Sequence, residues 1–263
     1  MKKLTKFLSL VLVLIISFIP LGCGSITKEN KASASIELNI SAAASLKEAM
    51  ADLQTAYKDV NPNVTLVTNF GASGSLEQQI EQGAPCDLFI SAGKSQMTQL
   101  KDEGLILDST DKDLVKNELV LVGPKDSTIS SINDLISDKV KKIAVGEANS
   151  VPAGKYADEV FTKLNIKSSI QSKLVFAKDV KEVLSWTASE NADVGFVYLS
   201  DALSSDSVKI IEQIPSEYHS PITYPVGIIN TSKNQDTAKN FEDFLLTDKA
   251  QKIFEKYGYK SVK

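Results

Sequence analysis

Small, hydroxyl-bearing and helix-capping residues gather at four turns of the sequence, each directly before or at the start of a predicted helix. Ser45 precedes a glutamate by three positions, as in a capping box, and so does Asp179. Ser73 stands between two glycines, and Pro152 fits a first helical turn. Hydroxyls and the amides of helix N-termini bind anions, and each N-terminus carries nominally about +0.5 of charge. Ordinary capping explains any one turn, but four together favour a site for a dianion. The four turns are Ser41–Glu48, Phe70–Leu76, Ser150–Gly154 and Lys178–Glu182.

The composition excludes several common ways in which proteins bind an anion or a metal ion. The chain of 263 residues has one histidine, two cysteines and no arginine, so all 29 basic residues are lysines. So few histidines and cysteines cannot build a four-ligand zinc site, and bidentate arginine clamps are absent. A net charge of -4 and a pI near 5.2 provide no basic patch for nucleic acid. We therefore expect neutral donors at the anion site, no cofactor and no nucleic-acid partner.

Strands and helices alternate along most of the chain, which is typical of an α/β protein built from βαβ units. The periodicity predicts strands over 36–40, 64–70, 88–91, 119–122, 142–146, 174–176, 194–198, 208–211 and 224–229. It predicts helices over 46–60, 76–82, 96–103, 111–116, 132–137, 153–164, 180–187, 237–246 and 249–257. Ligands of open α/β sheets bind beyond the carboxyl ends of the strands, where helices begin. The elements can therefore bring the four turns together.

The N-terminus is typical of an export signal. Three lysines precede an apolar run of 14 residues, Phe7–Pro20, which is too short for a comfortable transmembrane helix. Cys23 follows at the position of a bacterial lipoprotein cleavage site, so we expect residues 1–22 to be removed and Cys23 to carry a lipid. Residues 23–35 then form a flexible tether at the outer face of the cell membrane. The alternative is ordinary cleavage near Gly24 or Ser25.

An enzyme is the remote alternative, because Ser73 and His219 could belong to a serine hydrolase. The segment Gly71–Ser75 lacks the spacing of a nucleophile elbow, and His219 lies in a polar loop. Cys86 precedes an apolar strand, and no second cysteine or histidine accompanies it, so the sequence predicts a buried free thiol. We expect a protein that is not an enzyme.

A larger set of segments, in order and at specific spacing, carries a family resemblance. They are Ala42–Leu46, Phe70–Ser75, Gln79–Pro85, Asp87–Ser91, Ala144–Gly146, Val151–Gly154 with Tyr156–Ala157, Asp179–Val180, Gly195–Tyr198, Tyr224–Val226 and Ile253–Gly258. With them the chain resembles the molybdate-binding proteins of bacterial ABC importers along essentially all of Ile36–Tyr259. The resemblance implies an extracytoplasmic, monomeric protein that delivers molybdate, and also tungstate, to a permease in the membrane.

The resemblance also implies a two-lobed periplasmic-binding-protein-like fold of type II. Each lobe is expected to be a mostly parallel sheet flanked by helices, and two crossing segments near Glu118–Val122 and Ile222–Ile229 form the hinge. Lobe I would comprise residues 34–118 and 226–263, and lobe II residues 119–225. Closure of the two lobes would complete the site and expel water.

In this family the oxyanion is held by neutral donors from both lobes. The matching positions here are the hydroxyls of Ser45 and Ser73, the amides of Ala153 and Val180, and the hydroxyl of Tyr198. Molybdenum or tungsten would be present only within the oxyanion, with no direct bond from the protein to the metal.

The choice among tetrahedral oxyanions depends on protons and on size. Molybdate and tungstate are fully deprotonated and have only acceptor oxygens, which suits a site made of donors. Sulfate meets the same requirement and would be excluded by cavity size alone. Phosphate near neutral pH keeps a proton that needs an acceptor, and the nearby candidate, Asp179, is expected to be occupied as a helix cap. A binding protein for sulfate or phosphate is the alternative function.

Overall fold

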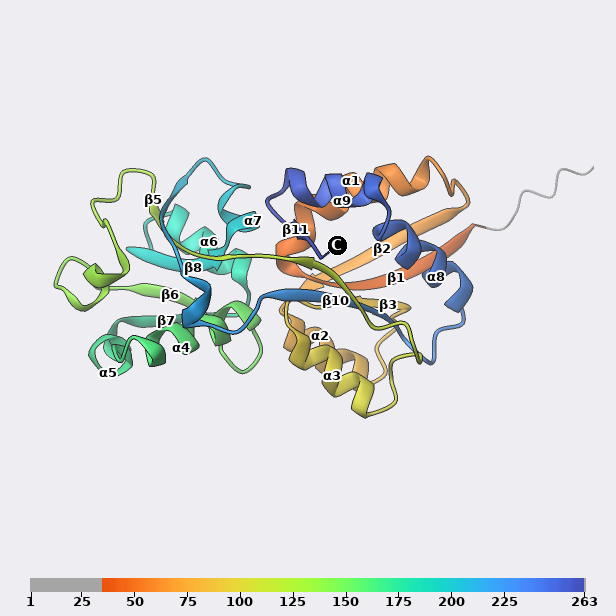
Figure 1. Ribbon diagram of the computed structural model, residues 1–263, viewed down its shortest axis with the longest axis horizontal. Coiled ribbons are helices and arrows are strands. Elements are labelled where there is room, and N and C mark those ends of the chain that lie inside the picture. Colours follow the sequence, from red (N-terminus) through yellow and green to blue (C-terminus); the bar gives the residue numbers. More distant parts are fainter. Residues whose placement is uncertain (1–34, 263) are drawn as a thin grey trace, which may run out of the picture. The chain divides into compact units, whose positions relative to one another are not determined.

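The computed structural model describes residues 35–262, which form two β-sheets with helices packed against them (Figure 1). The predicted signal peptide, Cys23 and all of the predicted tether except Ser35 lie outside the described residues. Within 35–262, every helix is too short or too polar to cross a membrane.

The first sheet has six strands in the order β11-β4-β10-β3-β1-β2. The strands are β1 (Ile36–Ala43), β2 (Val64–Gly71), β3 (Leu88–Ile90), β4 (Lys112–Lys116), β10 (Thr223–Ile228) and β11 (Lys260–Ser261). The helices interspersed with them are the 3₁₀ helix η1 (Ala44–Leu46), α1 (Lys47–Lys58), α2 (Ser73–Glu81), α3 (Lys94–Asp102), α8 (Gln235–Leu245) and α9 (Asp248–Lys256).

The second sheet has five strands in the order β7-β6-β8-β5-β9. The strands are β5 (Leu119–Pro124), β6 (Ile143–Gly146), β7 (Leu174–Ala177), β8 (Val194–Tyr198) and β9 (Val208–Gln213). The helices are α4 (Pro152–Lys163), α5 (Lys167–Ile170), α6 (Val180–Ala188) and α7 (Leu199–Ala202), with the 3₁₀ helices η2 (Ile132–Ile136), η3 (Gln171–Lys173) and η4 (Ser216–Tyr218).

The α/β fold class is confirmed, but the two sheets are mixed rather than mostly parallel. β1 pairs in parallel with β2 and β3, and β6 pairs in parallel with β7 and β8. β5 and β10 instead pair antiparallel with all of their neighbours. Each of these two strands enters its sheet directly from the other sheet, without the crossover helix that brings a parallel strand back in the same direction.

The chain passes between the sheets twice, over residues 117–118 and over residues 214–222. The strands of the first sheet come from 36–116 and 223–261, and those of the second sheet come from 119–213. Figure 1 labels β5 and β10, the strands that follow these two passages. The exact boundaries of lobe I and lobe II stay predictions.

The segment 111–116 is a strand, so the prediction of a helix there was wrong. β4 pairs antiparallel with β10 and β11, and Leu114 and Val115 are fully buried. Charged residues on both sides of this short apolar pair resemble a helical pattern, but pairing with two strands distant in sequence decides the structure. Most other predicted elements are present with ends shifted by one to three residues.

Strands inside the two sheets are buried throughout. Every residue of β3, β6 and β8 is buried, as expected for strands covered on both faces. The edge strand β2 instead alternates between exposed and partly buried residues over most of its length. Of these strands, β6 leads to the turn at Ser150–Gly154 and β2 leads to the turn at Phe70–Leu76.

Gly146 and Gly154 allow α4 to begin in contact with the end of β6. A Cβ atom on Gly154 would lie 2.0 Å from the carbonyl oxygen of Gly146, and one on Gly146 would lie 2.4 Å from the side chain of Val151. Real Cβ contacts are never this close, so the backbone approach requires glycine at both positions.

Replacing Gly154 with alanine therefore tests this contact by the sign of its effect. Helix propensity alone predicts that Gly154→Ala stabilises the protein by up to about 1 kcal/mol. The contact with Gly146 predicts a loss of about 1–3 kcal/mol in the free energy of unfolding by urea. Gly71→Ala is the matched control, because its nearest neighbour is the movable side chain of Leu76 at 3.3 Å. Stabilisation by Gly154→Ala would contradict the packing argument.

Candidate functional site

The four turns converge on one small cavity between the two sheets. Its volume is about 10 Å³, room for about one water molecule. The walls are the carboxyl ends of β1, β2 and β8 and the first turns of η1, α2, α4 and α6. The lining residues are Ala43, Ala44, Ser45, Gly71, Ala72, Ser73, Ala92, Val151, Pro152, Val180 and Tyr198.

Four of the five predicted contact residues line this cavity, namely Ser45, Ser73, Val180 and Tyr198. The fifth, Ala153, is fully buried and does not line it, although the two residues before it do. Ala153 carries the first amide N–H of α4, because the preceding residue of the helix is proline. Val180 is likewise the first residue of α6. The first amides of a helix have no partner within the helix, so both can serve a ligand.

Neither serine caps its helix, which corrects the prediction of a capping box at Ser45. η1 begins at Ala44, and no side-chain cap is present at the start of η1, α1 or α2. The Ser45 hydroxyl instead hydrogen-bonds to the Tyr224 hydroxyl at 2.8 Å. The Ser73 hydroxyl accepts the amide N–H of Ala92 at 2.9 Å. Tertiary hydrogen bonds have replaced local capping, and the one to Ser73 leaves the serine proton for another acceptor.

Asp179 caps α6, as the sequence predicts. Its carboxylate accepts the amide N–H of Glu182 at 2.9 Å. This carboxylate is therefore engaged away from the cavity. The cavity-lining residues of the described chain include no charged side chain.

Tyr198 brings a phenol to the cavity at the end of β8. It is 1% exposed, and burial raises its pKa well above the ordinary value, so it stays a neutral donor. Its hydroxyl donates a long hydrogen bond of 3.5 Å to the carbonyl oxygen of Ala92. Its ring packs edge-on against Tyr224, with centroids 5.7 Å apart.

Two polar contacts, besides the hydrogen bond from Tyr198 to Ala92, join the walls on either side of the cavity. The amide of Gly74 in α2 donates to the carbonyl oxygen of Ser150 at 2.9 Å. A Cβ atom on Gly74 would lie 2.8 Å from that same backbone, so this approach also requires glycine.

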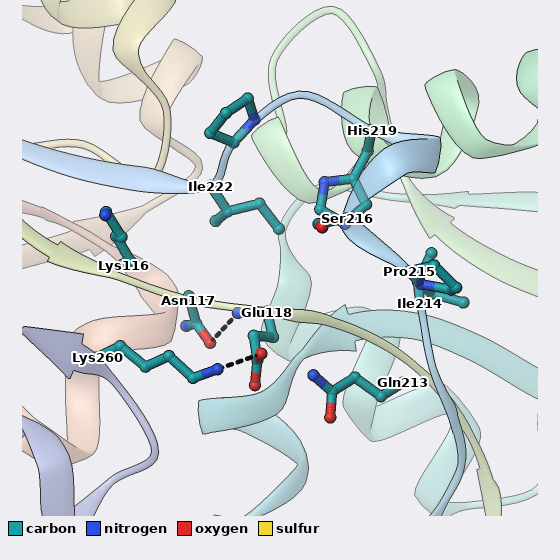
Figure 2. A pocket seen from close by; sticks show the side chains of 11 residues that line it. Lys116, Asn117, Glu118, Gln213, Ile214, Pro215, Ser216, His219, Ile222 and Lys260 are labelled. Carbon is teal, nitrogen blue, oxygen red and sulfur yellow. Dashed lines mark hydrogen bonds and ion pairs between the residues drawn. The ribbon is translucent and has the colours of Figure 1, made fainter.

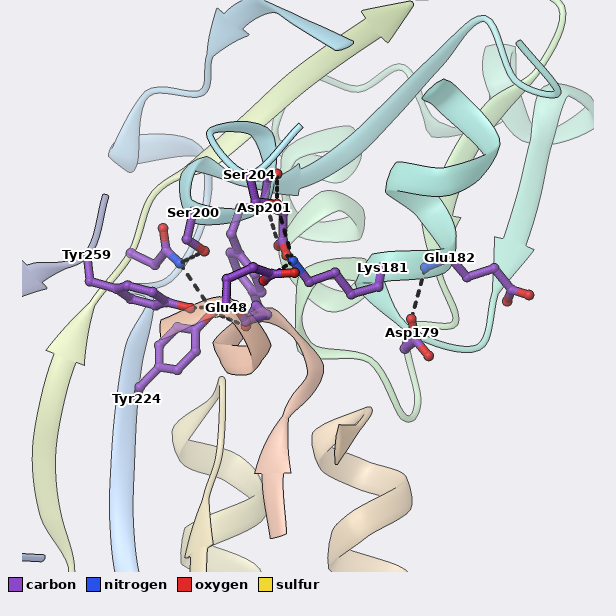
Figure 3. Close-up of polar contacts among 12 residues, drawn as sticks. Glu48, Asp179, Lys181, Glu182, Ser200, Asp201, Ser204, Tyr224 and Tyr259 are labelled. Carbon is purple, nitrogen blue, oxygen red and sulfur yellow. Dashed lines mark hydrogen bonds and ion pairs between the residues drawn. The ribbon is translucent and has the colours of Figure 1, made fainter. Parts of the chain in front are cut away.

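The second contact is an ion-pair cluster centred on Lys181 (Figure 3). The Lys181 ammonium lies 2.6 Å from a carboxylate oxygen of Glu48 in α1 and 2.9 Å from one of Asp201 in α7. Burial raises the pKa of the fully buried Asp201, and the charge of Lys181 opposes that rise. Burial lowers the pKa of Lys181, but Asp201 and Glu48 together raise it above its usual value. Lys181 therefore ties α6 and α7 to α1.

A larger groove of about 360 Å³ lies at the two passages between the sheets (Figure 2). It contains His219, Gln213 and the Lys260–Glu118 ion pair. Ser73 lines the small cavity and not this groove, so the structure gives no support to a Ser73–His219 catalytic pair. Within residues 35–262, no three His, Cys, Asp or Glu side chains are placed to hold a metal ion.

Cys86 is a free thiol, as predicted, but it is half-buried rather than buried. Its sulfur donates to the carbonyl oxygen of Leu88 at 3.3 Å, and burial raises the pKa of the thiol. A thiol with a raised pKa is a poor nucleophile.

Sequence reasoning missed the residues that support the two serines. Tyr224 lies 179 positions after Ser45, and Ala92 lies 19 positions after Ser73. Asn117 joins the same cluster through Tyr224. Tyr224 stands in a segment that carries the family resemblance, but nothing local in the sequence indicates its contact with Ser45.

The comparisons with known proteins agree with one another. The profile of the bacterial extracellular solute-binding protein family matches residues 38–260. The lipoprotein YvgL of Bacillus subtilis, assigned as a substrate-binding protein of an ABC transporter, is 42% identical over 90% of this chain and 92% of its own. The molybdate-binding protein ModA of Haemophilus influenzae is 34% identical over 98% of this chain and 99% of its own.

A solved structure extends this similarity to the fold. It is the substrate-binding domain assigned to a molybdenum ABC transporter of Clostridium difficile, with 64% identity and a TM-score of 0.69. The match covers 87% of this chain and 100% of that domain.

Lys181→Met tests the ion-pair cluster. It leaves the buried Asp201 carboxylate without a counter-charge, so we expect a loss of about 3 kcal/mol in unfolding free energy at neutral pH. The pKa of Asp201 is then raised further above its unfolded value. The variant therefore loses stability as the pH rises from the pKa of Asp201 in the unfolded chain to its pKa in the folded protein. The difference in unfolding free energy between variant and wild type should shrink at about pH 4.

Urea unfolding of the Lys181→Met variant across this pH range gives the measurement. The exposed pair of Lys94 with Asp113 provides the control, since Lys94→Met should cost less than about 1 kcal/mol at either pH. A deficit in Lys181→Met that stays the same at all pH values would contradict the role of Asp201.

Proposed function

Since the chain belongs to the family of bacterial extracellular solute-binding proteins, we propose that it captures molybdate and tungstate for an ABC importer. Proteins of this family bind solutes and are not enzymes. The proposal rests first on one observation, the convergence of three hydroxyls and the first turns of four helices on a cavity without charged side chains. The names of ModA and of the Clostridium difficile domain supply the choice of molybdate.

Each donor has a defined role in this proposal. The hydroxyls of Ser45, Ser73 and Tyr198 and the amides of Ala153 and Val180 donate to the oxygens of the anion. Helix N-termini stabilise the negative charge without a counter-ion from the protein. A fully deprotonated anion needs no acceptor, and the carboxylate of Asp179, which precedes Val180, is occupied by the Glu182 amide.

Binding requires movement of the two walls. A cavity of about 10 Å³ is too small for a tetrahedral oxyanion, since that volume holds about one water molecule. In our proposal lobe I (34–118 and 226–263) and lobe II (119–225) separate to admit the anion and close around it. Opening breaks the Gly74–Ser150 and Tyr198–Ala92 hydrogen bonds and the Lys181–Glu48 ion pair, whereas Lys181 and Asp201 belong to the same lobe.

The N-terminus completes the proposal. After removal of residues 1–22, a lipid on Cys23 anchors the protein, a monomer, at the outer face of the membrane, where it delivers the anion to its permease. The name of YvgL as a lipoprotein supports this arrangement. Mass spectrometry of the mature N-terminus tests it, and an unmodified residue 24 or 25 as the first residue would contradict it.

Calorimetric titration with molybdate, tungstate, sulfate and phosphate tests the ligand. We expect one-to-one binding of the first two anions and none of the others. Ser45→Ala and Ser73→Ala should each weaken molybdate binding by roughly 10- to 100-fold, because each removes a hydrogen bond to a charged ligand. Ser95→Ala, an exposed serine in α3, is the control and should bind like the wild type.

Other outcomes would replace the ligand or the whole proposal. Binding of sulfate or phosphate without molybdate would keep the solute-binding role and overturn the ligand. Full molybdate affinity in both serine variants would place the anion outside this cavity.

A further inference from the structure

A chain of buried hydrogen bonds runs from Asn117 to the hydroxyl of Ser45 through Tyr224, which Figure 3 labels. The side-chain nitrogen of Asn117 lies 3.3 Å from the Tyr224 hydroxyl, which lies 2.8 Å from the Ser45 hydroxyl. All three side chains are buried. Asn117 stands on the passage between β4 and β5, Tyr224 in β10, and Ser45 in η1.

The direction of the first hydrogen bond follows from the backbone. The amide N–H of Glu118 donates to the side-chain oxygen of Asn117 at 2.9 Å. This contact fixes which end of the Asn117 amide is oxygen, so its NH₂ group faces Tyr224 and the Ser200 hydroxyl, 2.9 Å away. An NH₂ group can only donate, so the Tyr224 oxygen accepts at this end.

The direction of the Tyr224–Ser45 hydrogen bond is assigned next. Asn117 can only donate to Tyr224, so we direct the buried Tyr224 proton to the Ser45 oxygen, where it has an acceptor. Tyr224 is fully buried, and burial raises its pKa well above the ordinary value, so it keeps that proton. The Ser45 oxygen accepts from Tyr224, so the single proton of Ser45 is left for a partner in the cavity that Ser45 lines.

We propose that Asn117 and Tyr224 are positioning residues that turn the proton of Ser45 into the cavity, an inference that rests on the proposed function. At this position the site then presents the serine proton to the ligand, while Tyr224 occupies one of the two lone pairs of the Ser45 oxygen. It favours an anion without protons and disfavours hydrogen phosphate.

Ser73 shows the same arrangement built from the backbone. Its oxygen accepts the amide N–H of Ala92, so its proton is also left for the cavity. Because the partner of Ser73 is a backbone amide, only a proline at position 92 would remove it, and proline would also change the backbone. The Ser45 arrangement depends on side chains and can be tested by conservative substitution.

A double-mutant cycle on molybdate affinity tests the proposal. Tyr224→Phe keeps the ring contacts with Tyr198 and Tyr259 and removes only the hydroxyl. We expect its molybdate Kd to rise by about tenfold in the wild-type background and by less than about twofold in Ser45→Ala. Asn117→Leu should follow the same pattern with a smaller loss. An equal loss in both backgrounds would overturn the proposal, because Tyr224 would then not act through Ser45.

Tyr259→Phe is the matched control. The Tyr259 hydroxyl donates to the carbonyl oxygen of Ser45 at 2.8 Å, and this carbonyl remains in Ser45→Ala. Any effect of Tyr259→Phe on the molybdate Kd should therefore be the same in both backgrounds. Loss of that effect in Ser45→Ala would show that the cycle reports general disturbance around residue 45, and would overturn the proposal.

Competition by inorganic phosphate tests the predicted selectivity. Without Tyr224 the Ser45 hydroxyl can rotate and accept a proton from hydrogen phosphate. Phosphate should displace molybdate from Tyr224→Phe at a concentration at least about tenfold lower, relative to the molybdate Kd, than from the wild type. If the displacing phosphate concentration, relative to the molybdate Kd, is the same for both proteins, Tyr224 does not direct the Ser45 proton and the proposal is overturned.

Unfolding of the ligand-free protein separates this proposal from the proposed function. Tyr224→Phe should lower the folding equilibrium constant by roughly fivefold in the wild type and by less in Ser45→Ala, because the Tyr224–Ser45 hydrogen bond is absent there. A wild type that binds no molybdate would overturn the proposed function. The unfolding measurements would still show whether the Tyr224 and Ser45 hydroxyls are coupled. Molybdate binding without any coupling between Tyr224 and Ser45 would overturn the positioning role and leave the function intact.

Discussion

The proposed function depends on one constraint, the stabilisation of a negative ligand by neutral donors alone. No arginine is present in the chain, and no charged side chain lines the cavity among the described residues. The favourable charge must then come from helix N-termini and hydroxyl protons, which act only over short distances. This constraint explains why four turns from distant parts of the sequence meet at one point.

Close backbone approach follows from the same constraint. Gly74 contacts Ser150, and Gly154 contacts Gly146, at distances that no side chain would permit. The charges of the protein lie outside the cavity, where Lys181 joins Glu48 to the buried Asp201. In the proposed function these ion pairs strengthen closure without placing a cation or a carboxylate beside the ligand.

Short sequence patterns predicted the features that depend on neighbouring residues alone, such as helix caps and apolar strands. The α6 cap by Asp179, the proline at the start of α4 and the buried strand β8 are all present. The strand at Lys112–Lys116 and the partner of Ser45 were missed, because both depend on pairing with residues more than 100 positions away. The contact roles of the five predicted residues came from the family resemblance and remain a proposal.

A crystal structure of the protein with molybdate bound would test the central claim most directly. We expect one anion between the two sheets, with its oxygens within hydrogen-bond distance of the Ser45, Ser73 and Tyr198 hydroxyls and the Ala153 and Val180 amides. We also expect that no lysine ammonium and no carboxylate contacts the anion. An anion bound by lysine side chains, or one seated in the groove beside His219, would contradict a site built from neutral donors.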